Sequence, residues 1–308
     1  MRTFRTLLPA LFLALATLTA PALAAAAEPP AAVRTIDRGR FTVEVTGEGP
    51  DVILIPGLAS SRAVWDPLMP SLKGYRVHRV QIAGFAGIPA GPNAEGPVVE
   101  PFVQALAAYI REAKLDRPAL IGHSMGGFSG LLLAQRHPEL VSRLMIVDAA
   151  PFIGALGNPS ATVEASRGPA EAFAAQVLAM DDATFARGQE GTAAFMIRTP
   201  ERRADMVKWS LSSDRRVIAR AMLDVMTTDA RPGLAGMTVP VTVLYAWDQA
   251  MSQPGREVPP ARMDAIYAQA YAGLPNVKLV RIDGAYHFLM LDQPERFAQE
   301  TQAFLAAK

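Results

Sequence analysis

The chain has 308 residues, of which 50% are hydrophobic and 19% are charged, and its formal net charge is +1. This composition is typical of a folded globular protein and excludes a disordered chain. The sequence has no long basic run, so we expect no nucleic-acid partner, and the absence of cysteine excludes disulfides and thiolate metal sites.

Residues 1–24 have the pattern of a secretory signal peptide. Two arginines near the start precede an apolar core over 7–18, and small residues follow it. Cleavage is expected after Ala24 or as late as Ala27. The apolar core is short for a membrane span, and an uncleaved anchor is the alternative. We therefore expect an exported protein, periplasmic or extracellular, with no stable membrane span after cleavage.

Strands and helices alternate after a short proline-containing tether at 28–32. Alternating polar and apolar residues at 41–45 indicate an edge strand, and the Gly- and Pro-rich stretch 84–101 indicates a loop. Asp292 is expected to cap the last helix of the chain. The other expected strands are 52–55, 75–80, 118–121, 144–147, 241–245 and 277–282, and the expected helices are 103–113, 125–136 and 294–307.

This alternation predicts an α/β fold, in which helices cover both faces of a mostly parallel sheet. Residues 152–237 have no strong strand signal, and their helical stretches are separated by Pro and Gly. We expect this segment to be a helical cap that crosses the C-terminal edge of the sheet, where open α/β sheets bind ligands. The core would then comprise 33–151 and 238–308.

The segment Gly122-His123-Ser124-Met125-Gly126 directly follows an apolar strand and leads into a helix. A Gly-x-Ser-x-Gly sequence in this context is typical of a nucleophile elbow. The turn strains the serine and exposes its hydroxyl, and Gly122 and Gly126 are needed because side chains there would collide. The alternative is a serine that only caps the following helix. Ser124 is therefore our candidate nucleophile.

Four features together resemble the lidded members of the α/β-hydrolase family. They are the elbow, Pro56-Gly57 after the first buried strand, and Asp248 and His287 after the last two strands. The segments 229–234 and 287–295 are similar to the family's return from cap to core and to its histidine loop. The resemblance covers nearly the whole mature chain and implies a serine hydrolase whose triad follows the chain order Ser, Asp, His.

The resemblance assigns His287 as the base and favours Asp248 as the acid. His287 is the only one of the four histidines that follows a predicted strand near the C-terminus. Asp248 closely follows the strand at 241–245, although the family's usual glycine in that turn is replaced here. Asp148, at the end of the preceding strand, is the alternative acid, because some members of the family place it there and the chain order is kept.

The family pattern also implies an oxyanion hole formed by the backbone N–H groups of Leu58 and Met125. We find no histidine and carboxylate spacing typical of a metal site, and we expect no metal and no cofactor. The cap is rich in aromatic and methionine residues, including Phe195, Met196 and Met222. If some of them face the cleft, the pocket is apolar and tolerant of varied ligands.

These observations predict an exported serine hydrolase that cleaves carboxylic esters of small to medium apolar acyl groups. Its partner would be a small-molecule ester. Hydrolysis of a lactone, an amide or a carbon–carbon bond by the same triad is an alternative. A further alternative is a ligand-binding protein that resembles a hydrolase but has little turnover.

Overall fold

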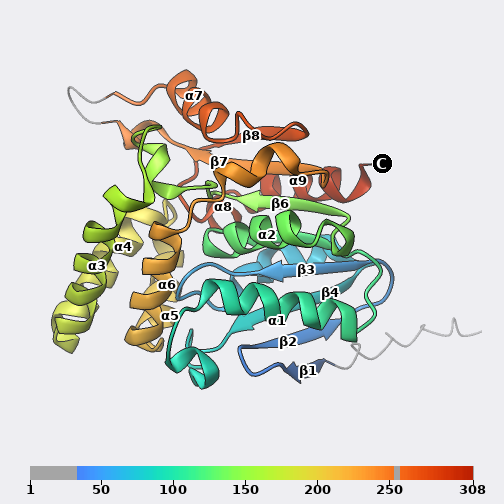
Figure 1. Cartoon of the computed structure of the whole chain (residues 1–308), viewed down its shortest axis with the longest axis horizontal. Coiled ribbons are helices and arrows are strands. Elements are labelled where there is room, and N and C mark those ends of the chain that lie inside the picture. The colour runs from blue at the N-terminus through green and yellow to red at the C-terminus, as the bar shows by residue number, and fades with distance from the viewer. Residues whose placement is uncertain (1–32, 253–256, 308) are drawn as a thin grey trace, which may run out of the picture. The chain divides into compact units, whose positions relative to one another are not determined.

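Eight strands form a single sheet in residues 33–252 and 257–307, which are the residues described in this computed structural model (Figure 1). The expected signal peptide lies outside the described residues. The strands are β1 (Arg34–Asp37), β2 (Phe41–Thr46), β3 (Asp51–Ile55), β4 (Arg76–Ile82), β5 (Ala119–His123), β6 (Arg143–Val147), β7 (Val241–Trp247) and β8 (Val277–Asp283).

The strand order is β1-β2-β4-β3-β5-β6-β7-β8. β1 and β2 are antiparallel to their neighbours, and all pairings from β4 through β8 are parallel. The predicted α/β fold with a mostly parallel sheet is therefore confirmed. The 41–45 strand is not at the edge, however, because β1 pairs along its outer side.

Helices cover both faces of the sheet. Figure 1 shows α1 and α2 crossing in front of it. Strand residues alternate between the faces, so Ile53 belongs to the buried cluster that contains residues of α1, α2 and α7, while Leu54 belongs to the one that contains residues of η1, α8 and α9. The helices of the core are η1 (Arg62–Leu72), η2 (Gly91–Ala94), α1 (Val99–Glu112), α2 (Met125–Arg136), η3 (Pro138–Leu140), η6 (Gln249–Met251), α7 (Pro260–Ala270), α8 (Leu289–Asp292) and α9 (Pro294–Ala306).

A group of helices lies between β6 and β7 in the chain and beside one end of the sheet (Figure 1, left). α3 packs along α6, and α4 along α5. They fall within the segment 152–237 in which we expected a cap. Their bounds are η4 (Ile153–Leu156), α3 (Val163–Ala179), α4 (Asp182–Met196), α5 (Pro200–Leu211), α6 (Arg215–Thr227) and η5 (Arg231–Gly236).

Two helix starts differ from expectation for reasons that lie far away in the chain. α1 begins at Val99, within the expected loop, because the carboxylate of Asp224 on α6 accepts hydrogen bonds from the N–H groups of Val98 and Val99. Asp292 does not cap α9, whose N-cap is Gln293 without a side-chain hydrogen bond. The carboxylate of Asp292 instead accepts three backbone N–H groups from other segments.

Candidate active site

Ser124 lies in the tight turn between β5 and α2. Its φ of 51° and ψ of −122° put it in a region that residues other than glycine rarely adopt. Its N–H donates to the carbonyl oxygen of Val147 at the end of the adjacent strand, at 2.9 Å. Its side chain makes no capping hydrogen bond to α2, so the interpretation of Ser124 as a helix-capping serine is wrong.

The glycines on either side of the serine are required by close backbone contacts. A Cβ on Gly122 would meet the carbonyl oxygen of Gly126, and one on Gly126 would meet the carbonyl oxygens of Ile55 and Pro56, all closer than real Cβ contacts. The elbow thus packs directly against the end of β3. Gly57 lies equally close, because a Cβ there would be 3.2 Å from the Cβ of Ser124.

Asp148, not Asp248, pairs with His287. Oδ2 of Asp148 lies 2.7 Å from Nδ1 of His287. An ionised carboxylate only accepts, so Nδ1 carries the proton and Nε2 is left able to accept one. Asp148 occupies the position on β6 that Ser124 occupies on β5, and its φ of 50° is also positive.

Asp248 has other partners. Nε of Arg198 donates to its Oδ2 at 2.8 Å, and the N–H of Ala250 donates to its Oδ1 at 2.8 Å. β7 continues through Trp247, so Asp248 follows the strand in extended backbone, with φ of −146°, and caps η6. The prediction that Asp248 holds His287 is therefore wrong, and the alternative carboxylate occupies that place.

Two groups that the sequence analysis did not name complete the surroundings of Asp148. The N–H of Ala246 and the hydroxyl of Tyr267 both donate to its Oδ1, at 3.0 and 2.9 Å. Burial, followed by the negative charge of Asp148, holds the pKa of Tyr267 well above its ordinary value, so the phenol remains a donor. The ring of Tyr267 stacks on Tyr245, with centroids 4.3 Å apart. A tyrosine eight residues after Pro259, the N-cap of α7 (Pro260–Ala270), is no recognisable signal in a single sequence.

His123 lies next to the loop that carries His287. It is buried, its ring centroid lies 4.5 Å from that of His287, and its Nε2 donates to the backbone oxygen of His287 at 3.1 Å. Burial, reinforced by His287, holds the pKa of His123 well below 6.5. His123 is therefore neutral, and it ties the histidine loop to the elbow without acting as a second base.

A cavity of about 680 Å³ joins these groups. Ser124, Asp148, His287, Leu58 and Met125 all line it, so the two residues expected to form the oxyanion hole border the same space as Ser124. The remaining wall is mostly apolar and comes largely from the cap. It includes Phe128, Ile153, Leu156, Phe195, Met196, Met222, Val225, Met251, Val258 and Tyr286.

The sequence profile described as "Alpha/beta hydrolase family" matches residues 52–300. The chain belongs to the α/β-hydrolase family. It is 34% identical over 111 residues to the pimeloyl-[acyl-carrier protein] methyl ester esterase of Aeromonas hydrophila subsp. hydrophila, a match that covers 36% of this chain and 42% of that protein. The chain thus spans less than half the length of this curated relative.

Other matches to this α/β hydrolase are longer but less similar. A putative 2-succinyl-6-hydroxy-2,4-cyclohexadiene-1-carboxylate synthase of Bacillus subtilis is 24% identical over 281 residues, covering 85% of this chain and 94% of that protein. The solved structure of an esterase from Exiguobacterium antarcticum superimposes with a TM-score of 0.70 at 18% identity, covering 87% and 96% of the two chains. The Exiguobacterium structure therefore shows that the two proteins have a similar fold.

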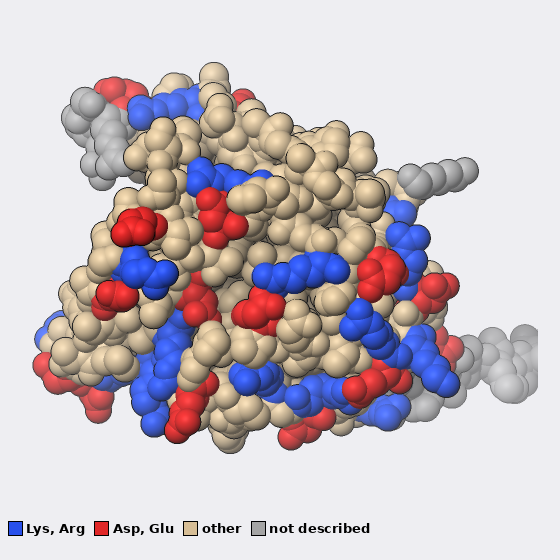
Figure 2. Space-filling model, in the orientation of Figure 1, with Lys and Arg blue, Asp and Glu red and all other residues tan. Residues whose placement is uncertain are grey.

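The surface of this α/β hydrolase bears interspersed charges. On the face shown in Figure 2, basic and acidic side chains intermingle without a broad area of one sign. Within the residues that the structure describes, no helix combines the length and the apolar character that crossing a membrane requires.

Proposed function

We propose that this α/β hydrolase is a serine esterase that uses Ser124, His287 and Asp148 to cleave carboxylic esters of small to medium apolar acyl groups through an acyl-enzyme. The observation that carries the proposal is the 2.7 Å contact between His287 and Asp148 at the wall of the cavity that Ser124 also lines. The name of the Aeromonas relative, a methyl ester esterase, supports the choice of an ester.

In this mechanism the hydroxyl of Ser124 attacks the ester carbonyl while Nε2 of His287 takes its proton. Asp148 holds Nδ1–H and stabilises the imidazolium that forms. The N–H groups of Met125 and Leu58 stabilise the oxyanion of the tetrahedral intermediate, and the positive end of α2 adds to their field. His287 then protonates the leaving alcohol, and a water that it activates releases the acid.

The lining of the cavity supports an uncharged apolar substrate. Among the described residues of its wall there is no lysine or arginine, and its one carboxylate, Asp148, is bound by His287, Tyr267 and Ala246. Methionines at three places in the wall, Met196, Met222 and Met251, can adapt their shape to different acyl groups. A charged group placed here would lose its hydration without gaining a partner.

The test is turnover of p-nitrophenyl butyrate by Ser124→Ala, with Ser160→Ala, an exposed serine in a cap loop, as the matched control. Ser124→Ala should abolish turnover and labelling by a fluorophosphonate probe, and should keep the circular dichroism spectrum. Ser160→Ala should retain both activities. Turnover that survives Ser124→Ala would refute the assignment of the nucleophile.

We also propose that the protein is exported, on the basis of the basic, apolar and small-residue pattern of its first 24 residues. Expression of the full chain in a Gram-negative host should yield a product that starts after Ala24 or as late as Ala27, outside the cytoplasm. N-terminal sequencing of fractionated cells checks this. An intact N-terminus in the cytoplasmic fraction would contradict it.

A further inference from the structure

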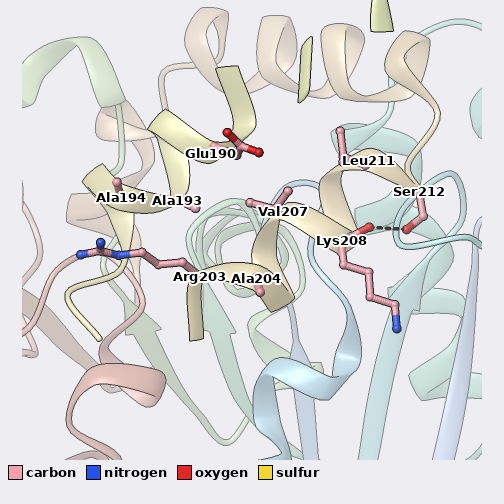
Figure 3. Close-up of a pocket in the computed structure, with 9 residues that line it drawn as sticks. All are labelled: Glu190, Ala193, Ala194, Arg203, Ala204, Val207, Lys208, Leu211 and Ser212. Atoms are coloured by element: carbon pink, nitrogen blue, oxygen red, sulfur yellow. Dashed lines mark hydrogen bonds between the residues drawn. The ribbon is translucent and has the colours of Figure 1, made fainter. Parts of the chain in front are cut away.

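The cap contains a second hollow, a groove of about 840 Å³ between α4 and α5 (Figure 3). Figure 3 shows the carboxylate of Glu190 between the two helices, with Arg203 and Lys208 extending away on opposite sides of the view. Charges of both signs therefore border the groove together with alanine, valine and leucine side chains, and it favours no one class of ligand. Of the described residues that line it, only Ala194 also lines the catalytic cavity. The polar groups that bear on the proposed reaction lie in the wall of the catalytic cavity instead.

The wall of the catalytic cavity includes a phenol, Tyr267, that the proposed mechanism does not use. Tyr267 lies on α7, and only 5% of it is exposed. Its hydroxyl donates to Oδ1 of Asp148 at 2.9 Å, while Nδ1 of His287 lies 2.7 Å from Oδ2 of the same carboxylate. The N–H of Ala246 is the second donor to Oδ1, at 3.0 Å. Three donors thus fix the plane of the carboxylate and keep Oδ2 facing His287.

Tyr267 is one of three buried tyrosines that pack together here, and its hydroxyl is the one that reaches the proposed acid. Tyr245 on β7 stacks on Tyr267 with an angle of 16° between the rings, but its hydroxyl donates to Asp264 at 2.8 Å. Asp264 is in turn paired with Arg281 on β8, at 2.6 Å. Tyr271, one turn further along the chain from Tyr267, donates to a backbone carbonyl oxygen. The three phenols therefore have three different acceptors.

The phenols and the neighbouring histidine keep one charge state near neutral pH. Burial, followed by the charge of the carboxylate that it binds, holds the pKa of Tyr267 well above its ordinary value. Burial also raises the pKa of Tyr271, and it raises that of Tyr245 to about 12. Burial keeps His123 on β5 neutral beside His287 by holding its pKa well below 6.5. The three phenols are thus neutral donors throughout the pH range in which a histidine base works.

We propose that Tyr267 is a positioning residue, whose hydroxyl orients the Asp148 carboxylate and, by stabilising charge on Oδ1, limits the negative charge that Oδ2 presents to His287. The inference rests on the proposed function, which makes His287 the base and Asp148 its acid partner. A carboxylate that loses a donor holds a neighbouring imidazolium more strongly. Without the phenol, His287 would therefore remain protonated to higher pH, and a protonated His287 cannot accept the proton of Ser124.

The test is the pH profile of kcat/KM for p-nitrophenyl butyrate in Tyr267→Phe, which keeps the ring and removes the donor. Tyr271→Phe is the matched control, because it removes a buried hydroxyl that donates to the carbonyl oxygen of Ala149 and not to the carboxylate. Tyr267→Phe should shift the midpoint of the acidic limb upward by about 0.5–1 pH unit. It should also lower kcat by about tenfold and leave KM within about twofold, since one charge-assisted hydrogen bond is lost and the ring remains.

Tyr271→Phe should leave the midpoint unchanged. No shift in Tyr267→Phe, or an equal shift in both variants, would overturn the proposal. Incorporation of 3-fluorotyrosine at position 267 gives a second variant if Tyr267→Phe does not fold. It keeps the hydrogen bond with a more acidic donor, so the midpoint should move downward, and an unchanged or higher midpoint would count against the role of Tyr267.

A measurement without turnover separates this proposal from the proposed function. The titration of His287 is followed by NMR with isotope-labelled histidine, and His287→Gln assigns the signal. Absence of ester turnover in the unaltered protein would refute the esterase. An upward shift of the His287 titration in Tyr267→Phe, but not in Tyr271→Phe, would still uphold the positioning role, and equal midpoints in the two variants would overturn it.

Discussion

Ser124 and Asp148 share an unusual backbone conformation, with φ angles of 51° and 50°. Each is the first residue after one of two neighbouring parallel strands, β5 and β6. A non-glycine residue held in such a region costs about 1–3 kcal/mol, and it persists only where the surrounding structure enforces it. Hydrogen bonds from Ser124 N–H to Val147 and from Asp148 N–H to Leu244 provide that constraint. The strain directs both side chains into the catalytic cavity.

The choice of acid gives a prediction at a single residue. Asp148→Asn keeps the shape of the side chain but removes the charge that holds the proton on Nδ1 of His287. We expect kcat for p-nitrophenyl butyrate to fall by about 10³–10⁴-fold, as for loss of the charge that orients a catalytic histidine. Asp248→Asn should leave kcat within about threefold, because the Asp248 carboxylate pairs with Arg198, and exposed ion pairs contribute little.

Steady-state kinetics of the two variants, with thermal unfolding to verify folding, separates the two carboxylates. A large loss in Asp248→Asn together with a small loss in Asp148→Asn would reverse the assignment.

At the scale of elements, the cap and the histidine loop are held together by Asp292. Its carboxylate accepts the N–H groups of Arg198 and Thr199, between α4 and α5, and that of Tyr286, next to His287. The N–H of Phe288 donates to the carbonyl oxygen of Met196 in the same region. The position of His287 therefore depends on the α4–α5 hairpin as well as on the sheet. The cap thus contributes part of the wall of the cavity, and it also helps to position His287, the proposed base.

Features that depend on neighbouring residues could be predicted from the sequence. The helix after the elbow was expected at 125–136 and is α2 with the same bounds. The need for glycine at 122 and 126 also follows from the tight turn alone. Short, polar β1 was missed, because only Ile36 among its four residues is partly buried. It is stabilised mainly by pairing with β2.

Features that depend on contacts between distant segments could not be predicted. Asp148 and Asp248 both follow strands, and the chain order allows either one. The difference is that β7 runs on through Trp247, so that its Ala246 N–H reaches Asp148 while Asp248 lies beyond. The groove between α4 and α5 likewise required the packing of two helices, which the apolar composition of the cap does not specify.

At the scale of the whole molecule, Asp224 connects the cap to the core. It lies on α6 between Met222 and Val225, which line the catalytic cavity, and one of its carboxylate oxygens accepts the N–H groups of Val98 and Val99 at the start of α1, at 2.6 and 3.0 Å. Burial raises the pKa of Asp224 above 3.8, although the two backbone N–H groups oppose this. The folded state therefore binds the proton of this carboxyl more tightly than the unfolded state does.

The sign of the pH effect follows from this difference. Stability contributed by protonated Asp224 is fully present below pH 3.8 and is lost as the pH rises through the higher pKa of the folded state.

Asp224→Asn retains an acceptor oxygen without a charge, so its free energy of unfolding should exceed that of the unaltered protein at pH 7, with the difference shrinking toward pH 3.8. Asp224→Ala leaves the N–H groups of Val98 and Val99 without their acceptor and should cost about 1–2 kcal/mol. Urea unfolding across this pH range checks both, with Glu171→Gln on the exposed face of α3 as the control. An Asn variant less stable than the unaltered protein at pH 7 would mean that the charge, and not only the acceptor, stabilises the attachment of the cap to α1.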